Sequence, residues 1–203
     1  MSIQRLGHRY IDVETQKTVD TWYPTANARI NRSCLAEKHG LVKGEFTELT
    51  IDSLDVPPLS TEDAYLRLHL LSERAVAPNC VNLDGIFALL PIVAWTSAGP
   101  VFPQHVESLR NLVAADYHHL TVPSIDRFPR MSDYVIPSGV RIADASRVRL
   151  GAHRWRTKSF GRQCRYWHLP GRRMHCRSGL VCHCRHQSQT TRRHGGNGSN
   201  AVW

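Results

Sequence analysis

Apolar and polar residues alternate with a period of two in several stretches of the first quarter of the chain. Residues 8–13 and 18–23 alternate on either side of a polar turn, which predicts a hairpin within residues 1–24. Residues 45–52 alternate in the same way and predict a half-buried strand. Residues 25–44 are polar and weakly patterned, so we expect a loop there.

The clearest helical pattern lies in residues 60–77. Ser60 precedes it, and Asp63 follows three residues later, which resembles a capping box with Asp in place of the usual Glu. The apolar face of this helix consists of Tyr65, Leu66, Leu68, Leu70 and Leu71. Pro78 is expected to end it, because the residue before a proline is disfavoured in the helical conformation.

Shorter elements complete the first two thirds of the chain. The patterns predict a short helix over residues 82–90, a strand over 92–96, a helix over 104–116 and a strand over 119–122. We expect the helix at residues 60–77 to pack on strands near residues 46–51 and 92–96. This mixture predicts an α+β N-terminal domain over residues 1–132.

A period of six begins after this domain. Ile136, Ile142 and Val148 are spaced six apart, with small and polar residues between them. Such hexads predict a left-handed parallel β-helix, in which three hexads make one coil and the aliphatic residues point inward. In the same register the next inward positions are Arg154, Phe160, Tyr166, Arg172, Ser178 and Cys184. Burying an unpaired arginine costs several kcal/mol, so the repeat is expected to cover only residues 133–153.

Composition changes abruptly at that point. Up to His153 the chain holds 15 Lys and Arg residues and 17 Asp and Glu residues, whereas residues 154–203 hold 11 Lys and Arg residues and no acid. The basic pI of 9.6 therefore comes from the last fifty residues and says nothing about the domain. No run of 18 apolar residues predicts a membrane span, and the N-terminus lacks the apolar core of a signal peptide. Isolated Cys34 and Cys80 fit a reducing cytoplasm.

The histidines of the domain offer little chemistry by themselves. We interpret His69, within the predicted helix, as a packed or surface side chain and not as a catalytic one. His118 and His119 are interpreted as exposed loop residues, because neighbours on a strand point to opposite faces and cannot share a metal.

Residues 154–203 admit three interpretations. Out-of-frame translation, which we favour, accounts for the sudden change at one bond, the loss of acids and the interrupted hexads. A zinc module would use Cys164, Cys176, Cys182, Cys184, His168, His175, His183 and His186, but their spacing lacks the paired cysteines of structural sites. A basic nucleic-acid-binding tail would use Arg172, Arg173, Arg192, Arg193, Trp155 and Trp167. With few aliphatic residues beside many cations, this segment is expected to be disordered.

Three runs carry a resemblance to a known family. They are residues 63–72 (Asp-Ala-Tyr-Leu-Arg-Leu-His-Leu-Leu-Ser), residues 82–87 (Asn-Leu-Asp-Gly-Ile-Phe) and residues 128–153, which begin Phe-Pro-Arg-Met-Ser-Asp-Tyr-Val. Over residues 1–153 the chain resembles the actinobacterial type of tetrahydrodipicolinate N-succinyltransferase. The resemblance implies a trimeric enzyme of the diaminopimelate route to lysine, with an α+β domain followed by a left-handed β-helix. Such enzymes move a succinyl group from succinyl-CoA onto ring-opened tetrahydrodipicolinate, at sites between subunits.

The chain departs from this family after His153. The family continues with further hexads and a Met-Val-Glu-Gly-Arg type of segment that holds the proposed catalytic glutamate, whereas Asp144 is the last acidic residue here. Ser146 aligns with an acidic residue that the family associates with a metal on the trimer axis. No catalytic, cofactor-binding or metal-binding residue can therefore be assigned, and we expect the chain to be inactive. The alternative is a non-catalytic basic protein that binds nucleic acid or zinc through residues 154–203.

Overall fold

A computed structural model describes residues 2–24, 34–77, 79–131, 136, 144 and 147–152. All of them belong to one of two units of the chain, Met1–Gly171, while the second unit, Arg172–Trp203, lies outside the described residues. The predictions for Ile142, Ser146 and residues 154–203 also fall outside the described part, and so does most of the predicted coil at residues 133–153.

The first sheet is built from the N-terminal hairpin and one further strand. β1 (Ile3–Asp12) and β2 (Thr18–Trp22) pair antiparallel, and β3 (Val42–Ile51) pairs antiparallel with the other edge of β1. The buried carboxylate of Asp12 shapes the hairpin turn, because its Oδ2 accepts hydrogen bonds from the backbone N–H and the hydroxyl of Thr15 at 2.7 and 2.6 Å. The predicted hairpin and strand are confirmed, and β3 begins earlier than predicted.

The loop predicted for residues 25–44 is wrong where the structure describes it. Leu35–Lys38 form the short helix α1, and β3 already starts at Val42. Ala36 is buried, and its backbone N–H donates to the carbonyl of Ala98 at 2.9 Å. Four residues are too few to show a period and too few to be stable alone, so tertiary contacts and not local pattern hold α1 in place.

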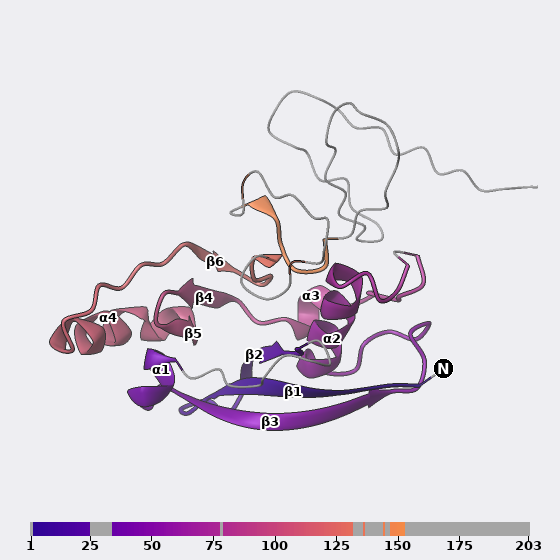
Figure 1. The fold of residues 1–203 in the computed structure, drawn as a ribbon. Coiled ribbons are helices and arrows are strands. Elements are labelled where there is room, and N and C mark those ends of the chain that lie inside the picture. The colour runs from indigo at the N-terminus through magenta and orange to yellow at the C-terminus, as the bar shows by residue number, and fades with distance from the viewer. Residues whose placement is uncertain are drawn as a thin grey trace, which may run out of the picture. The chain divides into compact units, whose positions relative to one another are not determined.

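The capped helix is α2 (Thr61–Ser72), which lies over the first sheet beside β2 (Figure 1). The side chain of Ser60 accepts the backbone N–H of Asp63 at 3.1 Å, as the capping pattern predicts. The predicted end at Pro78 is wrong, because the helix stops at Ser72 and Arg74 takes a positive φ of 61°. The predicted contact of α2 with the strand near residues 46–51 is confirmed, because α2 contacts β3, but the helix packs mainly on β2, which was not predicted.

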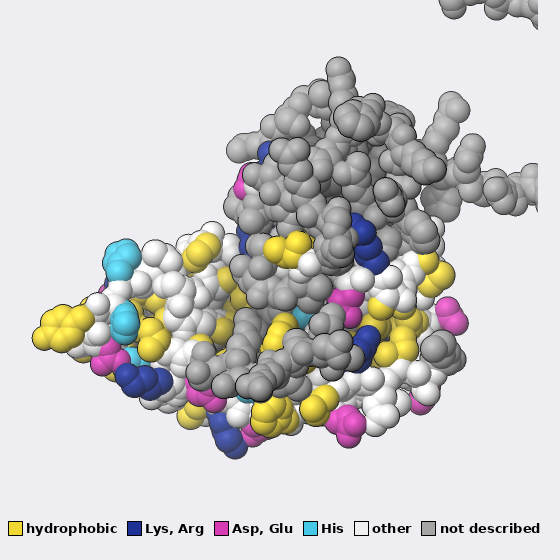
Figure 2. Space-filling model, viewed as in Figure 1, with side chains coloured by type: hydrophobic (Ala, Val, Ile, Leu, Met, Phe, Trp, Pro, Cys, Tyr) yellow, Lys and Arg dark blue, Asp and Glu magenta, His cyan; other side chains and the backbone are white. Residues whose placement is uncertain are grey.

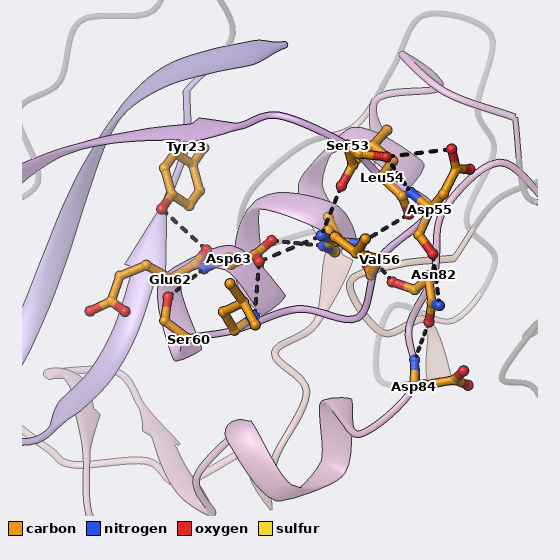
Figure 3. Close-up of polar contacts among 12 residues, drawn as sticks. Tyr23, Ser53, Leu54, Asp55, Val56, Ser60, Glu62, Asp63, Asn82 and Asp84 are labelled. Carbon is orange, nitrogen blue, oxygen red and sulfur yellow. Dashed lines mark hydrogen bonds and ion pairs between the residues drawn. The ribbon is translucent and has the colours of Figure 1, made fainter. Parts of the chain in front are cut away.

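A buried arginine of α2 joins this helix to two loops, and Figure 3 labels its partners Ser53, Leu54, Val56, Asp63 and Asn82. The side chain of Arg67 is fully buried and pairs with Asp63 through Nε at 2.7 Å. Its remaining N–H groups donate to the carbonyl oxygens of Ser53, Leu54, Val56 and Asn82. Asp63 in turn accepts the backbone N–H of Leu59 at 3.0 Å. A charge removed from water is tolerated here because its partner and four carbonyl groups satisfy it.

The second sheet joins β4 (Val93–Thr96) to β5 (Gly99–Val101) and β6 (Ser124–Asp126), both antiparallel to it. The helices α3 (Ile86–Leu89), η1 (Pro103–His105) and α4 (Val106–Ala115) flank these strands in the sequence. The predictions for β4 and α4 are confirmed, and the predicted helix at residues 82–90 contains α3.

The strand predicted at residues 119–122 is wrong, because the third strand, β6, forms only after Pro123. Leu120 is buried, but Thr121 meets the turn between β4 and β5 instead of a strand, through two hydrogen bonds of 3.0 Å with Ser97. The apolar residue Leu120 is therefore buried without being part of a paired strand.

The histidines lie as the sequence predicts. His69 is fully buried with its ring edge-on to Tyr23, and His118 and His119 are exposed. Figure 2 shows hydrophobic side chains, singly and in small groups, among polar ones on the part of this face that is not drawn in grey. Within the described ranges no helix is long and apolar enough to cross a membrane.

Candidate functional site

The chain folds back on itself where the domain meets the predicted hexads. Residues 127–131 follow β6, and residues 147–152 run antiparallel beside them, with Arg130 and Arg149 opposite each other. The backbone N–H of Met131 donates to Val148 at 2.9 Å, and that of Leu150 donates to Pro129 at 2.7 Å. We call these two stretches together the junction. It fixes the place where residues 147–152 leave the domain.

One hydrogen bond joins the junction to α2, and one ring contact joins it to α3. The side chain of Leu150 is fully buried, and the next residue, Gly151, donates its backbone N–H to the hydroxyl of Ser72 at 2.7 Å. Phe128 is also buried and packs edge-on against Phe87, with ring centroids 5.4 Å apart. The stretch that ends the predicted hexads is therefore packed into the core of the domain.

Charged side chains of the junction gather around one carboxylate. The Oδ2 atom of Asp126 accepts from Arg130 Nη1 at 3.3 Å and from Arg149 Nε. We call Asp126, Arg130 and Arg149 the Asp126 cluster. Its side chains are 18%, 17% and 33% exposed, so all three lie partly in reach of solvent. Asp126 is thus an acceptor shared by two guanidinium groups from the two stretches of the junction.

Asp126 is itself held in place from the strand side. Its Oδ1 accepts the backbone N–H of Arg127 at 2.8 Å, and its carbonyl accepts the indole N–H of Trp95 at 3.0 Å. The guanidinium of Arg127 turns away from the cluster and donates to the carbonyl of Leu90. This arrangement fixes Asp126 between the two stretches of the junction, and the three side chains of the cluster include no neutral base or nucleophile.

A carboxylate with a raised pKa lies beside the anchor. Glu73 follows Ser72, and burial raises the pKa of its carboxyl group, while the guanidinium of Arg5, 3.8 Å away, opposes the shift. On the other end of α2, burial would raise the pKa of Glu62, but hydrogen bonds from Thr18 and Arg9 outweigh it and lower that pKa. The pKa values of the carboxylates at the two ends of α2 are thus shifted in opposite directions.

No metal-binding or catalytic group emerges from the described residues. Among them no three His, Cys, Asp or Glu side chains gather as metal ligands would, and neither Cys34 nor Cys80 is in a disulfide. Ser146 lies outside the described residues, and its neutral hydroxyl fits a hard cation poorly where a carboxylate is expected. Sequence reasoning missed the Asp126 cluster, because nothing in the sequence signals that Arg130 and Arg149 lie side by side.

Comparisons with known proteins match the domain. The family described as "Tetrahydrodipicolinate N-succinyltransferase middle" matches residues 90–130, which include the second sheet, Asp126 and Arg130. The 2,3,4,5-tetrahydropyridine-2,6-dicarboxylate N-succinyltransferase of Salinispora tropica is 47% identical over 155 residues, covering 68% of this chain and 49% of the relative. The enzyme of that name from Pseudomonas aeruginosa is 53% identical over 104 residues, covering 51% of this chain and 30% of the relative.

A solved structure shares the fold. The crystal structure of a putative 2,3,4,5-tetrahydropyridine-2-carboxylate N-succinyltransferase from Campylobacter jejuni matches with a TM-score of 0.55 at 18% identity, over 73% of this chain and 53% of that one. This chain spans at most about half the length of the curated relatives it matches. The resemblance seen in the sequence is confirmed, since the chain is similar to tetrahydrodipicolinate N-succinyltransferases in both comparisons.

Proposed function

We propose that residues 1–153 are the N-terminal part of an acyltransferase that moves a succinyl group from succinyl-CoA onto tetrahydrodipicolinate, in the diaminopimelate route to lysine. The observation that carries this proposal is the 47% identity to the Salinispora relative over 155 residues. By the same resemblance, we propose a cytoplasmic homotrimer as the complete form of the enzyme.

The proposed reaction forms an amide and breaks a thioester. The amine nitrogen of the ring-opened acceptor attacks the thioester carbonyl, CoA leaves as a thiolate, and the nitrogen loses one proton. Reactions of two substrates depend on holding both in the right orientation. The buried core and the anchored junction support a positioning role for this part of the chain.

We propose that the 203-residue chain alone does not carry out this reaction. Residues 154–203 contain no acid and do not continue the hexads, so the glutamate that the family uses has no counterpart there. Out-of-frame translation after His153 is our explanation for this break. The missing hexads would also leave the binding sites between subunits incomplete.

The test compares two polypeptides in an assay for thiol release from succinyl-CoA in the presence of tetrahydrodipicolinate. One is the 203-residue chain, and the other joins residues 1–153 to the C-terminal remainder of the Salinispora relative. We expect turnover that depends on the acceptor from the chimera and none from the chain. Equal turnover by both would show that residues 154–203 are competent, and an inactive but folded trimeric chimera would refute the proposed function.

The competing proposal is a non-catalytic basic protein, and the observation that favours it is the net charge of +11 in residues 154–203. Binding of a single-stranded oligonucleotide should then fall steeply with salt, because it releases counterions. A zinc module would instead bind Zn²⁺ tightly and gain amide-exchange protection in this segment on metal addition. If zinc adds no protection, the metal hypothesis fails.

A further inference from the structure

We propose that Tyr117 of one copy of this chain packs on Leu6 and Phe46 of a second copy. The inference rests on the proposed function, which includes a homotrimer. Three copies in a closed ring meet through two different surfaces of each chain, so the assembly needs one surface that fits another on the same chain. The end of α4 at Tyr117 and the outer face of the first sheet at Phe46 are the two surfaces proposed.

Tyr117 has a backbone conformation that a tyrosine rarely adopts. Its φ is 61°, in the left-handed region. The backbone N–H of Tyr117 donates to Ala114 at 3.1 Å and that of His118 donates to Val113 at 2.8 Å, which is the Schellman pattern that ends many helices. The left-handed position of this motif is usually a glycine, because a Cβ atom there lies close to the following carbonyl oxygen. The chain therefore carries a bulky side chain where a glycine would be more stable.

The ring of Tyr117 does not offset this strain by packing on its own chain, because the side chain is 99% exposed. Leu112, earlier on α4, is exposed as well, and so are His118 and His119 after it. In Figure 1 the last turn of α4 lies at the left extremity of the described residues. A strained, exposed tyrosine at such an end is typical of a residue that contacts a partner, since tyrosine is prominent among the residues that dominate interfaces.

The second surface lies on the first sheet. In the pairing of β1 with β3, Leu6 lies opposite Glu48 and His8 lies opposite Phe46, so these four side chains share one face. Leu6 is 49% exposed and Phe46 is 65% exposed, and Glu48 accepts a hydrogen bond from Gln4 at 2.8 Å. We call Leu6, Phe46 and Glu48 the Phe46 face. Among the described strands β3 is at the edge of this sheet, so a partner can reach the face from the open side.

The polar groups of the two surfaces are complementary. Glu48 is exposed, and a carboxylate accepts more hydrogen bonds than the one it has. Beside Tyr117 the carboxylate of Asp116 already pairs with Lys38 at 3.2 Å, whereas exposed His118 and His119 bring imidazole N–H donors. Two Phe46 faces brought together would instead place one Glu48 near the other, which is unfavourable. The charges thus favour a contact between unlike surfaces, as a ring requires.

The test is photochemical cross-linking of the full 203-residue chain, because a covalent link records a contact that is too weak to survive dilution. Tyr117 is replaced by p-benzoylphenylalanine, a photoreactive analogue that keeps an aromatic ring at this position. Leu59, which is 85% exposed, receives the same analogue in the control protein. Residues 154–203 can promote unspecific association, but both proteins share that background. Mass spectrometry of the covalent dimer then identifies the linked segment.

We expect the probe at position 117 to form a covalent dimer with a yield about tenfold above that of the probe at position 59. The link should lie within β1 or β3 of the second copy. Phe46→Ser, added to the protein with the probe at position 117, should reduce the yield to the control value, because it removes the aromatic side chain that the probe contacts. A yield equal to the control, or a link to any other segment, would overturn the inference.

Tyr117→Gly separates the contact from folding. This variant should unfold at a temperature no lower than that of the wild type, because glycine adopts a positive φ without steric cost. A probe in place of Phe46 should link to the end of α4 in the wild-type background and lose that link when Tyr117→Gly is added. A clearly lower unfolding temperature of Tyr117→Gly would show that the tyrosine packs within its own chain and would reject the contact.

The cross-link is independent of turnover. An inactive chimera that still forms the link from position 117 to the Phe46 face would reject the transfer function and keep the contact. An active chimera that does not form this link would keep the function and reject the contact.

Discussion

The backbone N–H of Gly151 donates a hydrogen bond of 2.7 Å to the hydroxyl of Ser72, a residue 79 positions earlier in the chain. Gly151 has a positive φ of 91°, and a Cβ atom added there would lie 2.6 Å from Cδ2 of Leu68. Both Ser72 and Leu68 belong to α2 and are buried. The junction therefore approaches the helix more closely than any side chain at position 151 allows.

Gly151→Ala should lower the free energy of unfolding by about 2 kcal/mol. Backbone strain at positive φ contributes about 1 kcal/mol or more, and displacing the buried Leu68 contributes the rest. Urea denaturation measures the change. The matched control is Gly40→Ala, because Gly40 has φ of 72° but nothing lies within 4 Å of an added Cβ. Equal losses for the two variants would show that the contact with Leu68 is not tight.

Arg67→Met should be the most destabilising single change in α2, with a loss of about 3–5 kcal/mol. The substitution removes the guanidinium that satisfies the largely buried Asp63 and the carbonyls of two loops. Chemical denaturation again gives the value. As a control, Arg110→Met removes an exposed arginine and should change stability by less than about 0.5 kcal/mol. A loss below about 1 kcal/mol for Arg67→Met would mean that water replaces the lost donors.

Ser60→Ala should cost about 1 kcal/mol, because the backbone N–H of Asp63 loses the hydroxyl that accepts it. Ser60→Gly should lower the free energy of unfolding by only about a few tenths of a kcal/mol, since glycine is tolerated at the N-cap of a helix. Thermal unfolding of the two variants side by side separates the cap from general effects of substitution. Equal costs for alanine and glycine would count against the capping role.

The elements that were predictable from the sequence are those whose own residues carry a signal. β1, α2 and α4 show two-residue or helical periods, and Ser60 marks where α2 begins. The helix end was mispredicted because Pro78 is a strong signal, whereas the turn at Arg74, with its positive φ, has none. The backbone N–H groups of Arg74 and Ala75 donate to the carbonyls of Leu71 and Leu70, and this local turn ends the helix without a glycine to signal it.

The contacts that define the candidate site were not predictable, because they join residues far apart in the chain. Nothing in the sequence distinguishes Arg130 and Arg149 from other arginines, and only the fold shows that both donate to Asp126. Arg67 likewise sits on a helix face among leucines, and only the fold shows that it is buried. In a single sequence, buried positions are recognised by the periodic spacing of apolar residues. A charged residue that interrupts this spacing is therefore predicted to lie on the surface, even where the fold buries it.

Glu73→Gln should make the protein more stable relative to the wild type as pH rises. Burial raises the pKa of the Glu73 carboxyl above its ordinary value of 4.5. Between the ordinary and the raised value the folded state holds more protons than the unfolded state, so wild-type stability falls as pH increases through this window. Glutamine never ionises and avoids that loss. Urea denaturation at intervals from pH 4 upward should show the difference growing and then levelling off.

Glu62→Gln provides the opposite case on the same helix. The pKa of Glu62 is lowered, because hydrogen bonds from Thr18 and Arg9 overcome the effect of burial. Ionised Glu62 therefore stabilises the fold above pH 4.5, and this contribution disappears as the carboxyl is protonated at lower pH. Glu62→Gln should thus be less stable than the wild type at neutral pH and approach it in acid. If both glutamine variants changed with pH in the same direction, general acid unfolding and not these two side chains would control the titration.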